Sequence, residues 1–548
     1  MDYKRLSELL FPNVTTTAED MEKRFPQRDL KEGAKVTRFA PSPTGFVHFG
    51  SLFPTMVGER LAHQSGGVFY LRIEDTDAKR EVEGAVADIV NTYDKYDIHF
   101  DEGATADSEV GNYGPYYQSK RAEIYHTFAK LLVEKGLAYP CFCTEEELNE
   151  IRAEQEALKV NTGYYGKWAK YRDCDIETIE AKIKEGIPFV LRFRSTGSIE
   201  NKIKFTDLIK GTIEVTENDI DHVLLKSDGI PTYHFAHAVD DHLMRTTHVI
   251  RGEEWLPSLP FHIQLFSALG FKLPKYLHIS QLMKLDENGS KKKLSKRDAG
   301  AGVSYYFEQG YPSASVKEYV MTLLNSNFEE WRKANPDADM NTFPFSIKKM
   351  SASGSLFDFD KLNDVSKNTI AHMTADEVYL QVTAWAKEFD TELYNDFTAN
   401  PDYAKKILSI GRGTKKPRKD IAIWRDVKPY VSLFYDDLYE KQCDYPEGFD
   451  REDIKKALSL FADRYDENDD VNAWFEKVKN IAQELGFCPE TKLYKQNPEA
   501  YKGHVGDVSM FIRIALTGKT NSPDMFEVMK IMGREKSLNR IKNEINNI

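Results

Sequence analysis

Two short segments, far apart along the chain, combine residue types that could bind a nucleotide and stabilise charge on its phosphates. The first is FAPSPTGFVHFGS, which runs from Phe39 to Ser51, and the second is KLSKR, which runs from Lys293 to Arg297. Neither segment is informative alone, because short histidine–glycine and lysine patterns occur by chance in many long chains. Together, and in this order, they favour an ATP-dependent reaction at a carboxylate.

The first segment has the composition of a loop that lets a ligand lie against the backbone. Gly45 and Gly50 have no Cβ atom, so a base or ribose can approach the chain closely there. A helix that begins just beyond the loop would offer unpaired N–H groups to phosphates. His48 can donate a hydrogen bond to a phosphate oxygen. Taken alone, the segment is more typical of an ordinary turn between a strand and a helix.

The second segment supplies cations. Attack on the α-phosphate of a nucleotide builds negative charge on the phosphoryl oxygens and on the departing pyrophosphate. Lys293 and Lys296 would face that charge from a loop that closes over it. A run of lysines is more often a solvated surface, so this interpretation depends on the first segment.

The elements around the first segment indicate how it is positioned. Val36–Ala40 is rich in residues that favour strands, and a helical pattern follows from about Ser51 to Gln64. Val68–Asp75 then reads as a second strand. A strand, a helix and a strand at this spacing form a βαβ unit, which predicts a parallel sheet.

The predicted secondary structure changes twice along the later part of the chain. A mixed region lies between about 139 and 229, with helices predicted near Glu145–Leu158 and Ile176–Glu185. Pro231–Met244 and Thr247–Trp255 read as strands and loops. Beyond about residue 346, long helical patterns such as Arg451–Tyr465 dominate, so the last third is predicted to be helical.

Bulk properties restrict the class of protein. The chain has 548 residues, which is enough for several domains. It has no apolar run near the roughly 18–20 residues that span a bilayer, and its charged start does not read as a secretion signal. Five cysteines in this length favour reduced thiols. We therefore expect a cytoplasmic protein without a membrane partner.

The motifs resemble those of one family. FAPSPTGFVHFGS is similar to the HIGH signature of class I aminoacyl-tRNA synthetases in the form used by the glutamyl branch, and KLSKR resembles their KMSKS loop. Glutaminyl enzymes have Glu-Pro-Asn where this chain has Ser42-Pro43-Thr44. The resemblance extends from about Lys35 to the C-terminus. Further segments that resemble the family, in the same order, are Arg72–Asp77, Gly114–Ser119, Leu224–Met244, Thr247–Leu256 and His504–Lys536.

The resemblance implies a fold class and a division of the chain. We expect an α/β Rossmann-like catalytic domain with a parallel sheet, an α+β acceptor-binding insertion and an all-α C-terminal anticodon-binding region. The implied parts are an N-terminal extension (1–34), the first half of the Rossmann domain (35–138), the inserted tRNA acceptor-binding domain (139–229), the second Rossmann half with the KMSKS-type loop (230–345) and the helical anticodon-binding region (346–548).

The resemblance also assigns residues to the site. Arg38 and Arg251 match the arginines that bind the carboxylates of glutamate, which suits bidentate recognition, and together they should reject glutamine because its amide leaves a buried cation unpaired. Glu74 matches the ligand of the α-ammonium group. Ser42 and Tyr233 match hydrogen-bonding positions around the same substrate.

The nucleotide would contact a second set of residues. His48, Lys293 and Lys296 are implied as catalytic, and the ATP-binding set is Gly45, His48, Gly50, Glu254 and Lys296. The HIGH-type motif comprises Pro41, Ser42, Pro43, Thr44, Gly45, Phe46, Val47, His48, Phe49, Gly50 and Ser51, and the KMSKS-type motif comprises Lys293, Leu294, Ser295, Lys296 and Arg297. His237 departs from the family pattern, because relatives often have asparagine there.

ATP with Mg²⁺, L-glutamate and the tRNA for glutamate are the implied ligands, and we expect a monomer. The basic cluster Gly411–Asp420 falls in the anticodon-binding region, so phosphate contacts are assigned to Lys415, Lys416, Arg418 and Lys419.

Some relatives bind zinc through Cys-x-Cys and a later Cys-x-His. This chain has Cys141 and Cys143 but no later Cys-x-His pair that would complete a four-ligand site. We therefore favour two reduced cysteines and no metal site.

The implied activity is ligation of glutamate to tRNA through glutamyl-adenylate, which gives glutamyl-tRNA, AMP and pyrophosphate. An enzyme that also charges the tRNA for glutamine stays open as an alternative. A short relative that modifies a tRNA base would lack the C-terminal helices. A noncatalytic tRNA-binding paralogue should have lost His48, Gly50 or the lysines of the loop, all of which are present.

Overall fold

The structure is a computed structural model, and it describes residues 1–45, 47–77, 80–295, 298 and 300–548. The chain forms two compact units. Unit 1 comprises Met1–Tyr305 and Val320–Asp358, and unit 2 comprises Tyr306–Tyr319 and Phe359–Ile548. Helices α10 (Ser304–Gln309) and α11 (Ser313–Leu324) carry the chain between the two units.

A parallel sheet organises the first half of unit 1. Strand β1 (Val36–Phe39) pairs in parallel with β2 (Val68–Leu71), and β2 pairs in parallel with β3 (Glu102–Ala104). The short β4 (Glu109–Val110) closes the sheet in the antiparallel direction. Helix α3 (Leu52–Gln64) connects β1 to β2, which confirms the predicted βαβ unit. The predicted second strand was too long, since β2 ends at Leu71 where the chain enters the site.

A second parallel pair lies beside β1. Strand β10 (His248–Gly252) pairs with β11 (Lys275–Ile279), and the N–H of Thr247 donates to the carbonyl oxygen of Val36 at 2.9 Å. Strands that run in parallel present their carboxyl ends at one edge of a sheet, where ligands usually bind. Side chains near the ends of β1, β2 and β10 are therefore brought together.

One predicted element is wrong. Pro231–Met244 was expected to form strands and loops, but Tyr233–Leu243 is helix α8. Its polar residues His237, Asp240 and Asp241 recur at helical spacing but are buried, so this polar side of the helix faces the protein interior instead of solvent. Contacts of these buried polar groups with other elements help to stabilise the helix.

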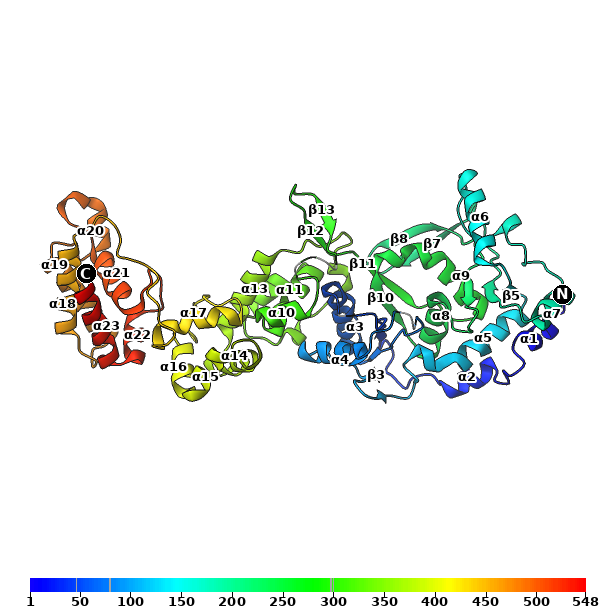
Figure 1. Cartoon of the computed structure of the whole chain (residues 1–548), viewed down its shortest axis with the longest axis horizontal. Helices are drawn as coiled ribbons and strands as arrows, with labels where there is room; N and C mark the ends of the chain where they lie inside the picture. Colours follow the sequence, from blue (N-terminus) through cyan, green and yellow to red (C-terminus); the bar gives the residue numbers. More distant parts are fainter. Residues whose placement is uncertain (46, 78–79, 296–297, 299) are drawn as a thin grey trace. The chain divides into compact units, whose positions relative to one another are not determined.

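The inserted region combines a small sheet with helices (Figure 1). Strand β6 lies between β5 and β9, and both pairings are antiparallel. A separate hairpin is formed by β7 and β8. The elements are β5 (Ala138–Cys141), α6 (Glu145–Ala157), α7 (Ile176–Lys184), β6 (Val190–Phe193), β7 (Lys202–Asp207), β8 (Gly211–Thr216) and β9 (Val223–Leu225).

The remaining elements of unit 1 complete its layers. Leu6 of α1 (Tyr3–Leu10) and Met21 of α2 (Ala18–Arg24) share one hydrophobic core with α5 (Ala122–Glu134), α8 and α9 (Leu259–Leu269). The elements are α1 (Tyr3–Leu10), α2 (Ala18–Arg24), α4 (Ala85–Lys95), α5 (Ala122–Glu134), α9 (Leu259–Leu269), β12 (Met283–Leu285), β13 (Lys291–Lys293) and α12 (Phe328–Ala334).

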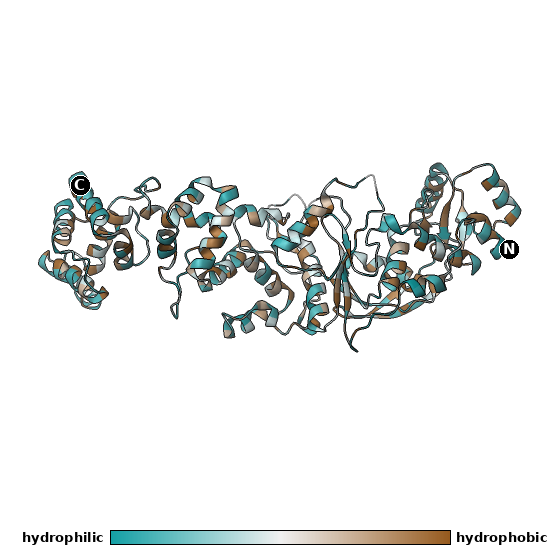
Figure 2. Cartoon of the chain, turned by 90° about the horizontal axis from the view of Figure 1, so that it is seen from below, coloured by the Kyte–Doolittle hydropathy of each residue, from teal (hydrophilic) through white to brown (hydrophobic). Residues whose placement is uncertain are grey.

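Unit 2 is helical in all of its described longer elements, which confirms the prediction for the last third of the chain. Hydrophobic and hydrophilic residues are interspersed along its helices (Figure 2), and many of the hydrophobic ones form one buried core. They are α13 (Phe359–His372), α14 (Ala375–Phe389), α15 (Thr391–Ala399), α16 (Pro401–Leu408), α17 (Val427–Val431), α18 (Arg451–Arg464), α19 (Val471–Glu484), α20 (Thr491–Gln496), α21 (Val505–Thr517), α22 (Met525–Met532) and α23 (Arg534–Asn547). Among the described residues, no helix is long and apolar enough to cross a bilayer.

Candidate functional site

A buried aspartate on α8 holds the two arginines at the ends of β1 and β2. Nε of Arg38 lies 3.2 Å from both carboxylate oxygens of Asp241, and Nη1 of Arg72 donates to Oδ1 at 2.6 Å. All three side chains are almost fully buried. Burial alone would raise the pKa of Asp241, but the two guanidinium groups hold that pKa well below its usual range. Asp241 therefore stays ionised and fixes both arginines.

Glu74 extends this network beyond Arg72. Nη2 of Arg72 donates to its Oε1 at 3.2 Å, and its backbone N–H donates to the carbonyl of Pro41 at 2.9 Å. Burial raises the pKa of Glu74 although Arg72 opposes the shift. A second cation close to this carboxylate, such as an ammonium group, would favour its ionised form.

Arg251, at the end of β10, has a different environment from Arg38 and Arg72. Its Nε donates to Nε2 of His278 at 3.0 Å, and its Nη1 lies 3.3 Å from Nδ1 of His262. The guanidinium carbon stands 4.7 Å from the ring centre of Tyr276. Within the described residues no carboxylate pairs with Arg251, and its buried Nη2 has no well-aligned acceptor.

Tyr233, at the start of α8, lies between these groups. Its ring packs on Trp255 with 4.2 Å between ring centres. Burial raises the pKa of its hydroxyl, while the charges of Arg251 and Arg38 lower it and that of Glu74 raises it further. Those effects require all three side chains to be near the hydroxyl. The structure thus brings four of the five predicted substrate residues together.

His237 is buried under this group and contacts protein on both sides of its ring. Nδ1 lies 2.7 Å from Oδ2 of Asp241, and Nε2 lies 2.9 Å from the hydroxyl of Tyr276. Burial lowers the pKa of His237 to about 3. The residue that departs from the family pattern therefore helps to support the network around Asp241.

The loop with His48 has a defined hydrogen-bond arrangement. The N–H of Gly50 donates to Nδ1 of His48 at 3.0 Å, so the neutral ring carries its proton on Nε2. Phe49 N–H donates to the carbonyl of Ala301 at 2.7 Å, and Val303 N–H donates to that of Val47 at 3.0 Å. The backbone after KLSKR therefore lies against the HIGH-type loop.

The described part of KLSKR ends a hairpin. β12 and β13 pair in the antiparallel direction, and the exposed Lys293 is the last residue of β13. Leu294 is buried, and its N–H donates to the carbonyl of Leu282 at 2.9 Å. Ser295 N–H donates to Oδ2 of Asp298 at 2.7 Å. The predicted residues Lys296 and Arg297, like Phe46 of the first motif, lie outside the described residues.

The remaining predicted nucleotide and substrate positions differ in the space around them. Ser42 and Thr44 are exposed. Gly45 has a φ of +139°, and no heavy atom lies within 4 Å of the place where a Cβ atom would stand. The carboxylate of Glu254 folds back over Gly252, within 2.1 Å of where its Cβ would be. The loop therefore has room for a ligand at Gly45, whereas at Gly50 a Cβ atom would stand 3.1 Å from Nδ1 of His48, so the missing side chain there accommodates the histidine ring.

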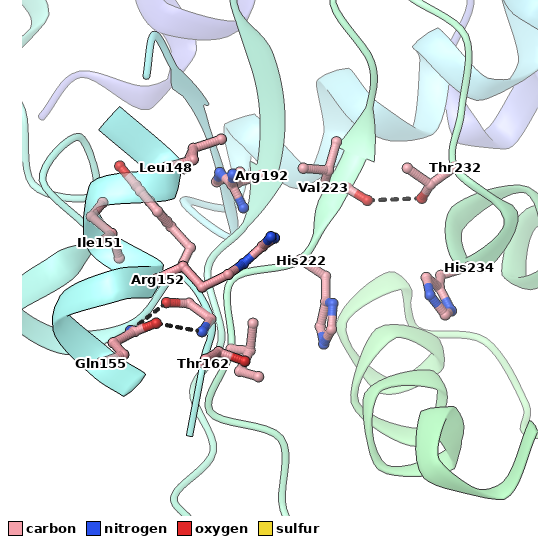
Figure 3. A pocket seen from close by; sticks show the side chains of 13 residues that line it. Leu148, Ile151, Arg152, Gln155, Thr162, Arg192, His222, Val223, Thr232 and His234 are labelled. Atoms are coloured by element: carbon pink, nitrogen blue, oxygen red, sulfur yellow. Dashed lines mark hydrogen bonds between the residues drawn. The ribbon is translucent and has the colours of Figure 1, made fainter. Parts of the chain in front are cut away.

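The insertion contains a cavity that the sequence did not indicate. It has a volume of about 450 Å³ and lies between α6, β9 and the start of α8 (Figure 3). Arg152, Arg192, His222 and His234 are among its lining side chains. Burial lowers the pKa of both histidines to about 4, so the two imidazoles are neutral near pH 7.

The structure gives no metal site in the part of the chain that it describes, since no three His, Cys, Asp or Glu side chains are grouped to bind an ion. Sγ of Cys143 lies 3.5 Å from the hydroxyl of Tyr164. Lys170 pairs with Glu147.

The basic cluster in unit 2 is exposed. Arg418 pairs with Asp420 at 2.6 Å. Lys415, Lys416 and Lys419 have no ion-pair partner among the described residues. Three cations without internal partners are available to an anionic surface.

Sequence reasoning missed the residues that hold the arginines. Asp241, His262 and His278 contact Arg38 or Arg251, yet none was singled out. The four-residue spacing of His237 and Asp241 would have been a signal on a helix, but their segment was predicted as strand and loop. The contacts of His262 and His278 join separate elements, and no local pattern marks them.

Two family models match the chain. One, described as tRNA synthetases class I (E and Q), catalytic domain, matches residues 35–364, and the other, described as anticodon binding domain, matches residues 381–545. The chain therefore belongs to the class I tRNA synthetases of the glutamate and glutamine group. This confirms the predicted family and the predicted fold class.

Individual relatives agree with the family match. The chain is 54% identical over 544 residues to a glutamate–tRNA ligase of Acetivibrio thermocellus, covering 99% of this chain and 100% of the relative. It is 50% identical over 547 residues to one of Clostridium perfringens, with 99% and 100% covered. A solved glutamate-tRNA synthetase of Elizabethkingia anophelis matches with a TM-score of 0.72 and 28% identity, covering 94% of this chain and 100% of that one.

The network around Asp241 leads to a prediction about stability. Asp241→Asn removes the charge that compensates two buried guanidinium groups, so we expect unit 1 to lose about 3–5 kcal/mol of unfolding free energy. Differential scanning calorimetry of the full chain measures the change. Glu19→Gln, which breaks an exposed pair with Lys23, is the control and should leave the transition in place. An unchanged transition in Asp241→Asn would show that the network does not stabilise the unit.

Proposed function

We propose that this chain ligates L-glutamate to the tRNA for glutamate in two ATP-dependent steps. The α-carboxylate of glutamate attacks the α-phosphorus of ATP, and pyrophosphate leaves. The 2′-hydroxyl of the tRNA terminus then attacks the carbonyl carbon of the adenylate, and AMP leaves. The relatives at 50–54% identity over nearly the full length, named glutamate–tRNA ligases, support this proposal.

The unpaired charge of Arg251 is the observation that carries the proposal. A buried guanidinium normally has an anionic partner, because an uncompensated charge is destabilising in the protein interior. Arg251 is 5% exposed, and its hydrogen-bond partners are neutral groups, namely the imidazoles of His278 and His262 and the hydroxyl of Tyr233. A carboxylate of glutamate would supply the missing negative charge, whereas the amide of glutamine would not.

The other substrate residues suit the remaining groups of an amino acid. Glu74 would bind the α-ammonium group, and the hydroxyls of Tyr233 and Ser42 would donate hydrogen bonds nearby. Arg38 donates through Nε to Asp241 and through Nη1 to the carbonyl of Ile250, which leaves its Nη2 without an acceptor among the described residues. We infer that Arg38 shares the substrate carboxylates with Arg251.

The nucleotide would lie against the HIGH-type loop. His48 would donate to a phosphate from Nε2, and Lys293 and Lys296 would stabilise charge on the phosphates as they react. The backbone at Gly45 and Gly50 would contact the nucleoside, with Glu254 near its ribose. The described residues form no carboxylate cluster for a metal ion. We therefore propose that Mg²⁺ enters with ATP, coordinated by phosphate oxygens, and we assign it no protein ligand.

The proposal includes the partners and the place of action. The helical unit 2 would bind the anticodon, with Lys415, Lys416, Arg418 and Lys419 against the RNA backbone. The inserted region would bind the acceptor end. We propose that the chain acts as a monomer in the cytoplasm.

ATP–pyrophosphate exchange tests the proposed reaction. We expect exchange that depends on glutamate, measured with and without tRNA, followed by charging of purified tRNA for glutamate. Folded protein that gives no exchange under either condition would contradict the proposal. Equal charging of the tRNA for glutamine would instead identify the variant of the enzyme that serves both tRNAs.

The lysine loop gives a second prediction. Lys296→Ala removes a cation that faces the reacting phosphates, so activation of glutamate should slow by roughly 100- to 1,000-fold, as for loss of one charge-stabilising donor. Single-turnover pyrophosphate release measures this step. Lys292→Ala is the matched control on the same hairpin, because Lys292 pairs with Asp286 at 2.9 Å. Equal rates in the two variants would remove Lys296 from the mechanism.

The exposed cluster gives a third prediction. Substituting Lys415, Lys416 and Lys419 together with alanine should weaken tRNA binding and reduce the dependence of log Kd on log salt by roughly one unit for each lysine that contacts a phosphate. Filter binding over a salt series measures the slope. The control replaces the exposed lysines Lys4, Lys23 and Lys31, which lie outside the proposed surface. Identical slopes in both triple variants would refute the assignment.

A further inference from the structure

A line of buried histidines leads to Arg251 from two sides. On one side, Nδ1 of His278 lies 2.7 Å from Oδ2 of Asp207, and its Nε2 accepts from Arg251. On the other side, Nε2 of His262 lies 2.9 Å from Nδ1 of His234, which lines the cavity of Figure 3. Both His262 and His278 are completely buried.

The hydrogen bonds determine where each ring carries its proton. An ionised carboxylate can only accept, so Nδ1 of His278 carries the proton toward Asp207 and Nε2 offers its lone pair to Arg251. Arg251 has only donors, so Nδ1 of His262 must also accept. Its proton then stands on Nε2 and is donated to His234. Both rings can hold Arg251 in this way only while they are neutral.

We propose that His262 and His278 are positioning residues that aim Arg251 at the substrate carboxylate while leaving its positive charge uncompensated. This inference rests on the proposed function and adds two residues to the amino acid site. A carboxylate in either position would also orient Arg251. It would, however, neutralise the charge that attracts the substrate.

The surroundings keep both imidazoles neutral. His278 faces Arg251 and Lys210, whose charges lower its pKa, and Asp207, which raises it, but burial has the largest effect and the net shift is downward. Burial also lowers the pKa of His262 well below its usual range, with Arg251 and the neighbouring His222, His234 and His237 acting in the same direction. Both groups thus remain acceptors throughout the neutral pH range.

Substitutions at His278 separate orientation from charge. His278→Ala removes the acceptor, so the KM for glutamate in ATP–pyrophosphate exchange should rise roughly 10- to 100-fold, as expected for a hydrogen bond to a charged group. The KM for ATP should not change. His278→Gln places an amide oxygen near the position of Nε2 and should recover most of the loss. His278→Glu keeps an acceptor but neutralises Arg251, so its KM for glutamate should stay high.

Variants of His262 test the same inference at the second positioning residue. His262→Asn retains an acceptor near the position of Nδ1, and His262→Ala does not, so only the alanine variant should raise the KM for glutamate. His248→Ala is the matched control, because His248 is a buried histidine of β10 whose Nδ1 bonds to Thr247 rather than to Arg251. Thermal unfolding of each variant identifies any that fail to fold.

The results that would contradict this inference differ from those that would contradict the proposed function. The inference is overturned if folded alanine variants at both sites keep the wild-type KM for glutamate, if His278→Gln is as impaired as His278→Ala, or if His278→Glu binds glutamate normally. Wild-type protein that shows no glutamate-dependent exchange would instead defeat the proposed function. The two failures are therefore distinguishable.

Discussion

Buried positive charge is the constraint around which unit 1 is organised. Arg38, Arg72 and Arg251 lie at or just beyond the carboxyl ends of β1, β2 and β10, and all three side chains are almost fully buried. Such an arrangement is stable only if the charges are compensated or are left for a ligand. Asp241 compensates Arg38 and Arg72, and Arg251 retains its charge. The difference between these arginines defines where an anionic substrate would bind.

Helix α8 serves as the support of this arrangement. Its first residue, Tyr233, lies beside the arginines, and Asp241 is located two turns further along. The far end of the helix is held by the N-terminal segment, since Glu22 lies 2.5 Å from His242 and 2.7 Å from Arg245. The first 34 residues, to which the sequence assigned no chemistry, are therefore part of the structure that fixes α8.

Backbone hydrogen bonds join the HIGH-type loop to the chain that follows the KMSKS-type motif. Val47 and Phe49 bond to Val303 and Ala301, which brings the loop of His48 beside the chain that follows the lysines. Backbone pairing of this kind does not depend on the identity of the side chains.

The sequence by itself determined much of the secondary structure and most of the residues predicted for the site. The βαβ pattern, the helical last third and the two motifs are local features, because the strand and helix periods and the glycine positions are properties of consecutive residues. Family resemblance then selected Arg38, Glu74, Tyr233 and Arg251 for the amino acid site. The structure brings those four side chains together.

Only the tertiary structure decided how these residues are held and charged. Whether the charge of a buried arginine is compensated depends on which elements pack against it. Asp241 is 203 positions from Arg38 in the sequence. His262 and His278 are 11 and 27 positions from Arg251. Helix α8 was mispredicted for the same reason. Its buried aspartates are compensated by arginines of other elements, and those partners are supplied by the fold rather than by neighbouring residues of the sequence.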